Sequence, residues 1–180
     1  MTEITGERLV LRELEPDDVG PRYAAWMNDP EITRFLETKP GSHTELSLRA
    51  YVEQVRADPS SHLFAIVLRE DGRHIGNIKL GPVVADHGRA DIGLVIGERD
   101  SWGHGYATEA IAALSAWAFA CLGLEKLTAG AYDVNVGSVR AFQRAGFLIE
   151  AVLRAHGAVD GRRVDVVLLA RLADGADSTG

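Results

Sequence analysis

The stretch that most constrains the fold runs from "IGLVIG" (residues 92–97) through "ERDSWGHGYATEA" (98–110) into a long apolar segment. The first part is a short apolar run typical of a buried strand, and the last part spaces its apolar residues as a helix does. Two glycines, Gly103 and Gly105, stand between them. A strand that enters a helix through Gly-x-Gly brings free backbone N–H groups to the helix N-terminus, where the helix dipole favours an anion. The stretch predicts an anion-binding turn, although a tight turn that binds nothing explains the same glycines.

Two familiar nucleotide motifs do not fit this turn. A dinucleotide-binding fold requires G-x-G-x-x-G near its first strand, and here Thr108 occupies the third glycine position. A P-loop requires Gly-Lys-Ser/Thr after its glycines, and no lysine follows them.

The rest of the chain alternates strand and helix patterns. Strands are expected at residues 8–14, 62–68, 74–84, 89–97, 125–133, 146–154 and 163–172, with hairpin turns at Asp71-Gly72 and in "VDGR". Helices are expected from Pro16 to beyond Trp26, briefly after Pro30, from a capping box at Ser42–Glu45 to about Arg56, from Ala107 to Cys121, and over "VGSVRAFQRA". This order predicts an α/β fold (α+β mixed sheet) with hairpins at the ends of the sheet and crossover helices in the middle.

Composition limits the kind of protein. The 180 residues suit one domain, for which we take residues 1–172, followed by a loose C-terminal tail at 173–180. The net charge of −7 argues against nucleic acid, and no apolar run is long enough for a membrane span. The lone Cys121 is expected to be buried helix filler and fits a reducing cytoplasm, which is the expected location. No metal site is expected.

"WGHGYATEA", followed about 30 residues later by "NVGSVRAFQRAGF", resembles the GNAT superfamily of acyl-CoA-dependent N-acetyltransferases, in particular its RimJ/RimL-like branch. The resemblance covers nearly the whole chain. It implies a central, mostly antiparallel sheet flanked by helices, in which two parallel strands splay apart to admit acetyl-CoA as co-substrate. A small-molecule amine is the implied second partner, and a homodimer is left open.

The resemblance implies a coenzyme site made largely of backbone. Main-chain groups of "LVI" would hold the pantetheine, one amide near Val95 or Ile96 would stabilise the oxyanion, and the Gly-x-Gly turn would hold the diphosphate. Asn135 would hold the pantetheine amide, and Arg144 would meet the adenine or 3′-phosphate end. The implied coenzyme-binding residues are Leu94, Val95, Ile96, Trp102, Gly103, His104, Gly105, Tyr106, Ala107, Thr108, Asn135, Ser138, Phe142 and Arg144.

Two positions depart from the superfamily pattern. Asp100 stands where a Gln or Arg is usual, and Arg99 or His104 could compensate for it. Phe142 stands where many members place a tyrosine acid. The proton donor to the leaving thiolate is therefore expected to be Ser138, which matches a branch residue near the coenzyme sulfur, or no dedicated acid at all. Asn135 and Ser138 can equally be read as residues that cap the next helix.

An amine must lose a proton to attack a thioester, so a general base is needed. Glu98 is chosen with Ser138 and Asn135 as the catalytic set, while the other candidates are Asp91, Asp133, Glu150 and His87. The acceptor wall is expected in "YAAWMNDPEITRFLE" and "GNIKLGPV", through Trp26, Asn28, Arg34, Asn77 and Lys79. These segments resemble branch members associated with amino-sugar acetylation, although core packing explains Trp26 equally well.

Three functional hypotheses follow. The leading one is acetyl transfer by direct attack of a primary amine of a small molecule, such as a nucleotide-linked amino sugar. The second acceptor class is a protein N-terminus, as in ribosomal-protein acetylation. A non-catalytic acyl-CoA-binding or regulatory module is the alternative of another class, supported by Phe142 and the lack of an obvious base.

Overall fold

One eight-stranded sheet forms the centre of the computed structural model, which describes residues 2–38 and 41–174. The strands lie in the order β1-β2-β3-β4-β5-β6-β8-β7, and only β5 and β6 pair in parallel. Their bounds are β1 Glu3–Thr5, β2 Leu9–Glu13, β3 His62–Leu68, β4 His74–Leu80, β5 Arg89–Ile96, β6 Lys126–Tyr132, β7 Leu148–Val159 and β8 Arg162–Leu172. The predicted mixed, mostly antiparallel sheet is confirmed.

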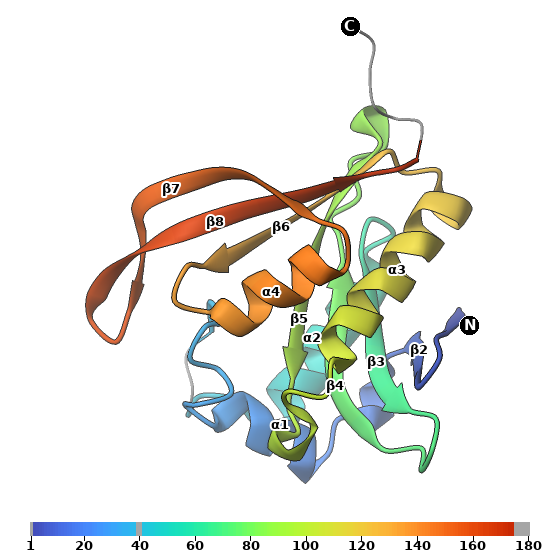
Figure 1. The fold of residues 1–180 in the computed structure, drawn as a ribbon. Coiled ribbons are helices and arrows are strands. Elements are labelled where there is room, and N and C mark those ends of the chain that lie inside the picture. The colour runs from blue at the N-terminus through green and yellow to red at the C-terminus, as the bar shows by residue number, and fades with distance from the viewer. Residues whose placement is uncertain (1, 39–40, 175–180) are drawn as a thin grey trace, which may run out of the picture.

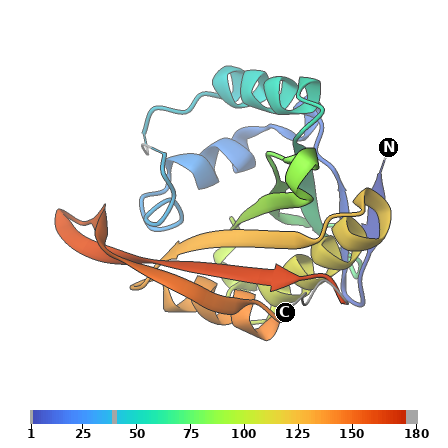
Figure 2. The same ribbon diagram turned by 90° about the horizontal axis from the view of Figure 1, so that it is seen from above.

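Helices cover both faces of the sheet (Figures 1 and 2). On one face lie α1 (Pro21–Asn28) and α2 (Glu45–Ala57), and on the other lie α3 (Tyr106–Leu122) and α4 (Val136–Arg144). Three short 3-10 helices complete the described elements: η1 (Pro16–Asp18), η2 (Ala85–His87) and η3 (Arg99–Ser101). Side chains alternate along β3, so that Phe64 and Ile66 pack under α3 while Leu63 and Ala65 pack under α1 and α2. The sheet therefore separates two hydrophobic cores.

The parallel pair β5–β6 holds together over three residues only. Arg89, Ala90 and Asp91 pair with the first residues of β6, and the pairing ends where the Thr128 hydroxyl donates a hydrogen bond to the Asp91 carboxylate. Beyond that point β5 continues to pair with β4, and β6 continues to pair with β8. The two strands therefore diverge, and within the described part of the chain one edge of β5 has no ladder partner from Ile92 to Ile96.

Several local predictions need correction. The capping box lies at Thr44 and Ser47 rather than at Ser42–Glu45, because the Thr44 hydroxyl is the one that accepts the Ser47 amide (3.1 Å). The segment after Pro30 forms turns, and the segment from Pro16 forms η1 before α1 begins at Pro21.

The ends of the chain also differ from expectation. Strand β1 was not predicted, since three residues are too few to show a periodicity. Cys121 is exposed, because it lies on the outer side of the last turn of α3. Of the predicted tail, Ala173 donates its amide to the Glu125 carbonyl (2.9 Å), and residues 175–180 lie outside the described part. Across the described residues, no helix is both long and apolar enough to cross a membrane.

Candidate active site

The turn between η3 and α3 has the geometry that its glycines predict. Gly103 and Gly105 adopt φ angles of +79° and +81°, a left-handed conformation that side chains with a Cβ rarely tolerate. Gly105 is the N-cap of α3. The indole Nε1 of Trp102 donates to the Ile96 carbonyl at the end of β5 (2.9 Å), which anchors the turn beside the open strand edge.

The backbone amides of this turn are available. Among the described residues, none of the N–H groups from Gly103 to Thr108 donates a hydrogen bond within the protein. They gather at the N-terminus of a 17-residue helix, where the helix dipole adds a partial positive charge. A diphosphate is an acceptor that such a group of amides fits.

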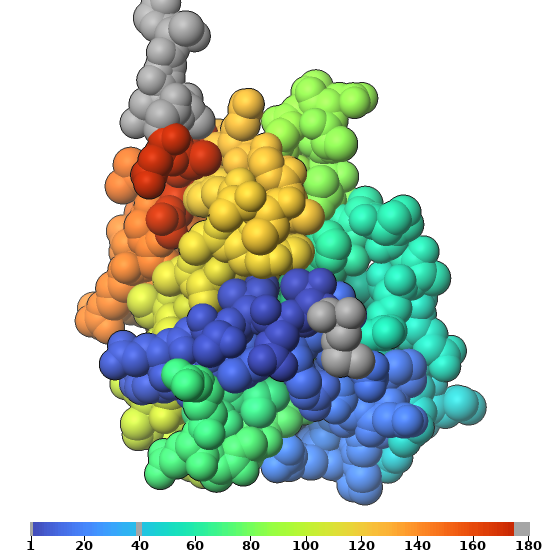
Figure 3. Space-filling view, turned by 90° about the vertical axis from the view of Figure 1, so that its right-hand side faces the viewer, coloured from blue at the N-terminus to red at the C-terminus, as the bar shows by residue number. Residues whose placement is uncertain are grey.

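Arg8, which the sequence analysis did not single out, holds the turn from the other side. Its guanidinium donates to the His104 carbonyl (2.9 Å), pairs with the Glu109 carboxylate (2.8 Å) and lies 4.7 Å from the centre of the Tyr106 ring. Glu109 also accepts the amides of Arg8 (2.6 Å) and Leu9 (3.1 Å). Figure 3 shows the N-terminal strands, in dark blue, lying against the yellow α3. Glu109 therefore has a structural role, and Arg8 adds a cation next to the free amides.

The carboxylate of the unusual Asp100 pairs with Arg73, which the sequence analysis did not name. Arg73 pairs with it at 2.6 Å, and this hydrogen bond lowers the pKa of the Asp100 carboxyl. Arg99 instead pairs with Asp29 and Glu31 in the segment after α1. The ring of His104 contacts the Trp102 carbonyl through Nδ1 (2.9 Å).

A cavity of about 230 Å³ occupies the space where β5 and β6 diverge. It brings together four of the predicted coenzyme residues, Leu94, Asn135, Ser138 and Phe142. Three further lining residues, Phe35, Leu36 and Glu37, belong to the segment expected to form the acceptor wall, and the sequence analysis assigned no site role to the others: Ile92, Gly93, Gly130, Ala131, Tyr132 and Val166. Arg144 lies outside it, exposed in the last turn of α4 and with no polar contact to the described residues.

Asn135 and Ser138 combine a structural contact with free polar atoms. Asn135 is the N-cap of α4, where its Oδ1 accepts the Ser138 amide (3.2 Å). The Ser138 hydroxyl and the Asn135 amide nitrogen have no hydrogen-bond partner within the described residues, and both side chains line the cavity. The capping reading is thus correct for Asn135 and wrong for Ser138, whose hydroxyl accepts no backbone N–H of the described residues, and both free groups remain open to a ligand.

The predicted bases already have partners in most cases. The Glu98 carboxylate accepts Trp26 Nε1 (3.1 Å) and lies 3.7 Å from Arg22 Nε. Among the other candidates, His87 is exposed on η2, and each carboxylate has a partner: Asp91 has Thr128, Asp133 has the Asp165 amide and Glu150 has Lys126. Glu98 is the candidate that contacts the helix expected to form the acceptor wall.

The predicted acceptor residues divide into framework and open positions. Trp26 is only 4% exposed and packs so closely on Gly97 that a Cβ at Gly97 would overlap its ring. Asn28 bonds the backbone of Ala24, Gly41 and His43. Both are framework residues, whereas Arg34 is exposed and reaches the turn after β7.

Asn77 and Lys79 lie on the α1–α2 face of β4, as predicted. They pair across the sheet with Val95 and Gly93. His74 donates Nε2–H to the Gly76 carbonyl (2.9 Å) and to Asn77 Oδ1 (2.8 Å), since a carbonyl can only accept. Burial lowers the pKa of His74, so this buried ring is neutral at pH 7. Asn77 presents its buried Nδ2 to no partner among the described residues.

An open parallel strand pair beside a helix N-terminus with free amides is the arrangement that the resemblance to acyl-CoA N-acyltransferases implies. Residues 8–148 match the family model described as Acetyltransferase (GNAT) domain. The chain therefore belongs to the GNAT acetyltransferase family, and it is an acyl-CoA-dependent N-acetyltransferase.

The relatives agree with this assignment. The chain is 30% identical over 176 residues to "Uncharacterized N-acetyltransferase p20" of Bacillus licheniformis, covering 96% of this chain and 97% of that protein. Among solved structures, spermidine N-acetyltransferase of Vibrio cholerae, in complex with CoA and spermine, superposes with a TM-score of 0.84 at 22% identity, covering 94% and 98% of the two chains. RimJ of Mycobacterium smegmatis, in complex with CoA-disulfide, superposes with a TM-score of 0.85 at 21% identity, covering 99% and 90%.

No group of three or more His, Cys, Asp or Glu side chains in the described residues is arranged to hold a metal ion.

Proposed function

We propose that this enzyme acetylates a primary amine of a small molecule by direct attack on acetyl-CoA, whose diphosphate the turn at residues 103–108 binds. The observation that carries the proposal is the set of unengaged amides at the N-terminus of α3, beside the unpaired edge of β5. The coenzyme supplies an activated acetyl thioester. The protein supplies position, an oxyanion donor and proton transfer.

The direction of the backbone groups along β5 limits which amides can stabilise the oxyanion. Gly97 N bonds Ile75 O, and Asp91 O accepts Gly81 N, so the backbone groups of these odd-numbered residues point toward β4. Because successive residues of a strand alternate in direction, Leu94 and Ile96 direct theirs toward the gap. We therefore assign pantetheine binding and oxyanion stabilisation to these two amides, and Val95 contributes its side chain on the acceptor face.

Ser138 and Glu98 divide the proton transfers. The amine nitrogen bonds to the thioester carbon and the carbon–sulfur bond breaks. The Ser138 hydroxyl gives a proton to the departing sulfur and regains one from solvent, to which Glu98 later releases the amine proton. Asn135 holds the pantetheine amide through its free nitrogen. Glu98 accepts the amine proton through water. No covalent acyl-enzyme is needed, because the thioester is reactive toward a neutral amine.

The acceptor is, in this proposal, a small polar amine such as a nucleotide-linked amino sugar. Solved structures of the same fold include a spermidine N-acetyltransferase and a ribosomal-protein-S5-alanine acetyltransferase, so the fold alone does not determine the class of acceptor. The RimJ/RimL-like branch belongs to the proposal because of the motif residues, and the likeness to RimJ at 21% identity adds the shared fold. The ion pair between Arg34 and Asp160 (2.6 Å) joins the segment after α1 to the turn between β7 and β8, and the preference for a small molecule rests on the resemblance of residues 23–37 and 76–83.

A panel of acceptors tests this proposal directly. The protein is mixed with acetyl-CoA and either amino sugars, their nucleotide-linked forms, polyamines or peptides with free N-termini, and released thiol is followed. Thiol release with small amines is the expected result. Release only with peptides would favour the protein N-terminal reading, and coenzyme binding without release for any amine would favour the non-catalytic module.

Ser138→Ala is expected to lower kcat about tenfold and to leave the KM for acetyl-CoA nearly unchanged. General acids typically contribute more than tenfold to kcat. The effect expected here is smaller, because a thiolate leaves without full protonation and because water can replace the hydroxyl. The backbone contact to Asn135 survives the substitution, and Ser138→Thr, which keeps a hydroxyl, is the matched control. Unchanged kcat in Ser138→Ala would leave Ser138 with no role beyond its backbone contact to Asn135.

A further inference from the structure

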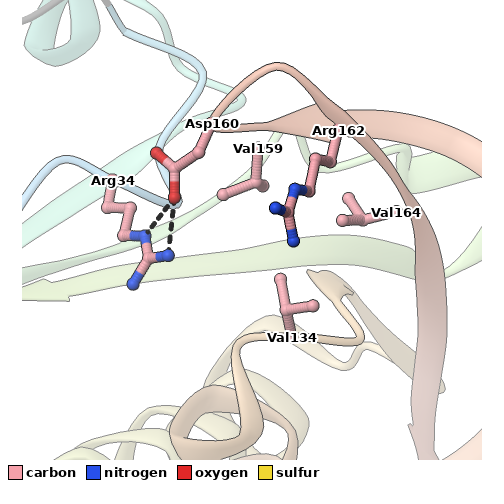
Figure 4. A pocket seen from close by; sticks show the side chains of 6 residues that line it. All are labelled: Arg34, Val134, Val159, Asp160, Arg162 and Val164. Atoms are coloured by element: carbon pink, nitrogen blue, oxygen red, sulfur yellow. Dashed lines mark hydrogen bonds and ion pairs between the residues drawn. The ribbon is translucent and has the colours of Figure 1, made fainter.

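We propose that the acceptor carries an anionic group, carboxylate or phosphate, and that Arg162 is the specificity-determining residue that binds it. This inference rests on the proposed function and names the chemistry of its acceptor. The group would occupy a second cavity, of about 390 Å³, lined by Arg34, Val134, Val159, Asp160, Arg162 and Val164 (Figure 4).

The second cavity adjoins the one between the splayed strands. Each of three chain segments lines both: Arg34 precedes Phe35, Val134 precedes Asn135, and Val164 lies two residues before Val166 on the same side of β8. A molecule whose amine reaches the thioester beside Ser138 can therefore extend toward the turn between β7 and β8.

The charges of this cavity do not cancel. Arg34 donates from Nε (3.0 Å) and Nη2 (2.6 Å) to one carboxylate oxygen of Asp160, so these two charges neutralise each other. Arg162 makes no ion pair or hydrogen bond with any described residue, and Figure 4 shows its guanidinium between the side chains of Val159 and Val164, directed toward Val134. One positive charge is therefore left in the wall.

The surroundings of Arg162 favour an anion. Its neighbours Val134, Val159 and Val164 are apolar, while Arg162 itself is exposed, so its guanidinium is open to a charged ligand that enters the cavity. The planar guanidinium matches carboxylate and phosphate oxygens in pairs. An unpaired cation at this position disfavours a polyamine, because each additional ammonium group would approach a like charge.

Matched acceptors and variants test the inference. Glucosamine 6-phosphate is compared with glucosamine, and lysine with lysinamide, so that the two pairs separate phosphate from carboxylate. The wild type is expected to prefer at least one anionic member. Arg162→Gln is expected to raise the KM for that member roughly 10- to 100-fold, with kcat and the KM for its neutral partner little changed. Arg163→Gln is the control, because the adjacent side chain points to the opposite face of β8 and bonds Ala155 O (3.5 Å).

The outcomes separate this inference from the function on which it rests. Acetylation of neutral and anionic members with equal efficiency, or an anionic preference that survives Arg162→Gln, overturns the role of Arg162 and leaves N-acetyl transfer to small amines standing. A preference for polyamines over both pairs likewise overturns the role of Arg162 and leaves N-acetyl transfer to small amines standing. If no member of either pair is acetylated, and only peptides or no amines at all are substrates, then both the role of Arg162 and the proposed function are overturned.

Discussion

The Gly105→Val variant is expected to bind acetyl-CoA at least about 100-fold more weakly than the wild type, since losing two hydrogen bonds to charged phosphate oxygens costs about 3 kcal/mol or more. A β-branched residue does not tolerate the φ of +81° at this position, so the turn changes conformation. A Cβ at this position also meets Nη2 of Arg8 at 3.6 Å, on the side from which Arg8 holds the turn. Isothermal calorimetry with acetyl-CoA measures the effect.

Gly72→Val controls for backbone strain. Gly72 has a similar φ, +72°, in the exposed turn between β3 and β4, and a Cβ there meets nothing within 4 Å. Both variants should lose about 1–2 kcal/mol of stability from the left-handed conformation, and only Gly105→Val should lose coenzyme affinity. A folded Gly105→Val protein that binds acetyl-CoA as tightly as Gly72→Val does would contradict the assignment of the turn.

Trp26→Ala is expected to lower the free energy of unfolding by about 3–5 kcal/mol, the range for truncating a buried aromatic side chain. Trp26 packs with Tyr23 and His74 in the core under α1 and α2, at ring-centroid distances of 5.9 and 5.1 Å. Its loss also removes a hydrogen bond from the half-buried Glu98 carboxylate. Urea denaturation measures the change.

The comparison with a second tryptophan separates packing from acceptor binding at Trp26. Trp102 is 40% exposed, so Trp102→Ala should cost clearly less stability than Trp26→Ala. If Trp26→Ala instead kept wild-type stability and raised the KM of the acceptor, Trp26 would belong to the acceptor wall that the sequence suggested.

The sequence pattern was sufficient to predict those elements that depend on residues close together in the chain. The strand at residues 62–68 and the Gly-x-Gly entry into α3 both follow from neighbouring residues. The helix expected after Pro30 did not form. There Asp29 accepts the amides of Glu31 and Ile32 and pairs with Arg99, and these contacts hold the segment in turns.

The remainder of the site depends on residues far apart in the chain. Arg8 and Glu109 are 101 positions apart, and Arg34 and Asp160 are 126 apart, so no window of sequence indicates either pair. Arg162 was missed for the same reason: an arginine after a hairpin turn looks like any exposed arginine until the fold sets it beside Val134 and Arg34. The motif residues Asn135 and Ser138 could be named because resemblance, rather than periodicity, pointed to them.

A crystal structure of the protein with acetyl-CoA is the most direct measurement of how this enzyme holds its co-substrate. We predict diphosphate oxygens within hydrogen-bond distance of the amides between Gly103 and Thr108, with the pantetheine passing between β5 and β6. Coenzyme bound elsewhere, with those amides facing only solvent, would contradict the proposed site.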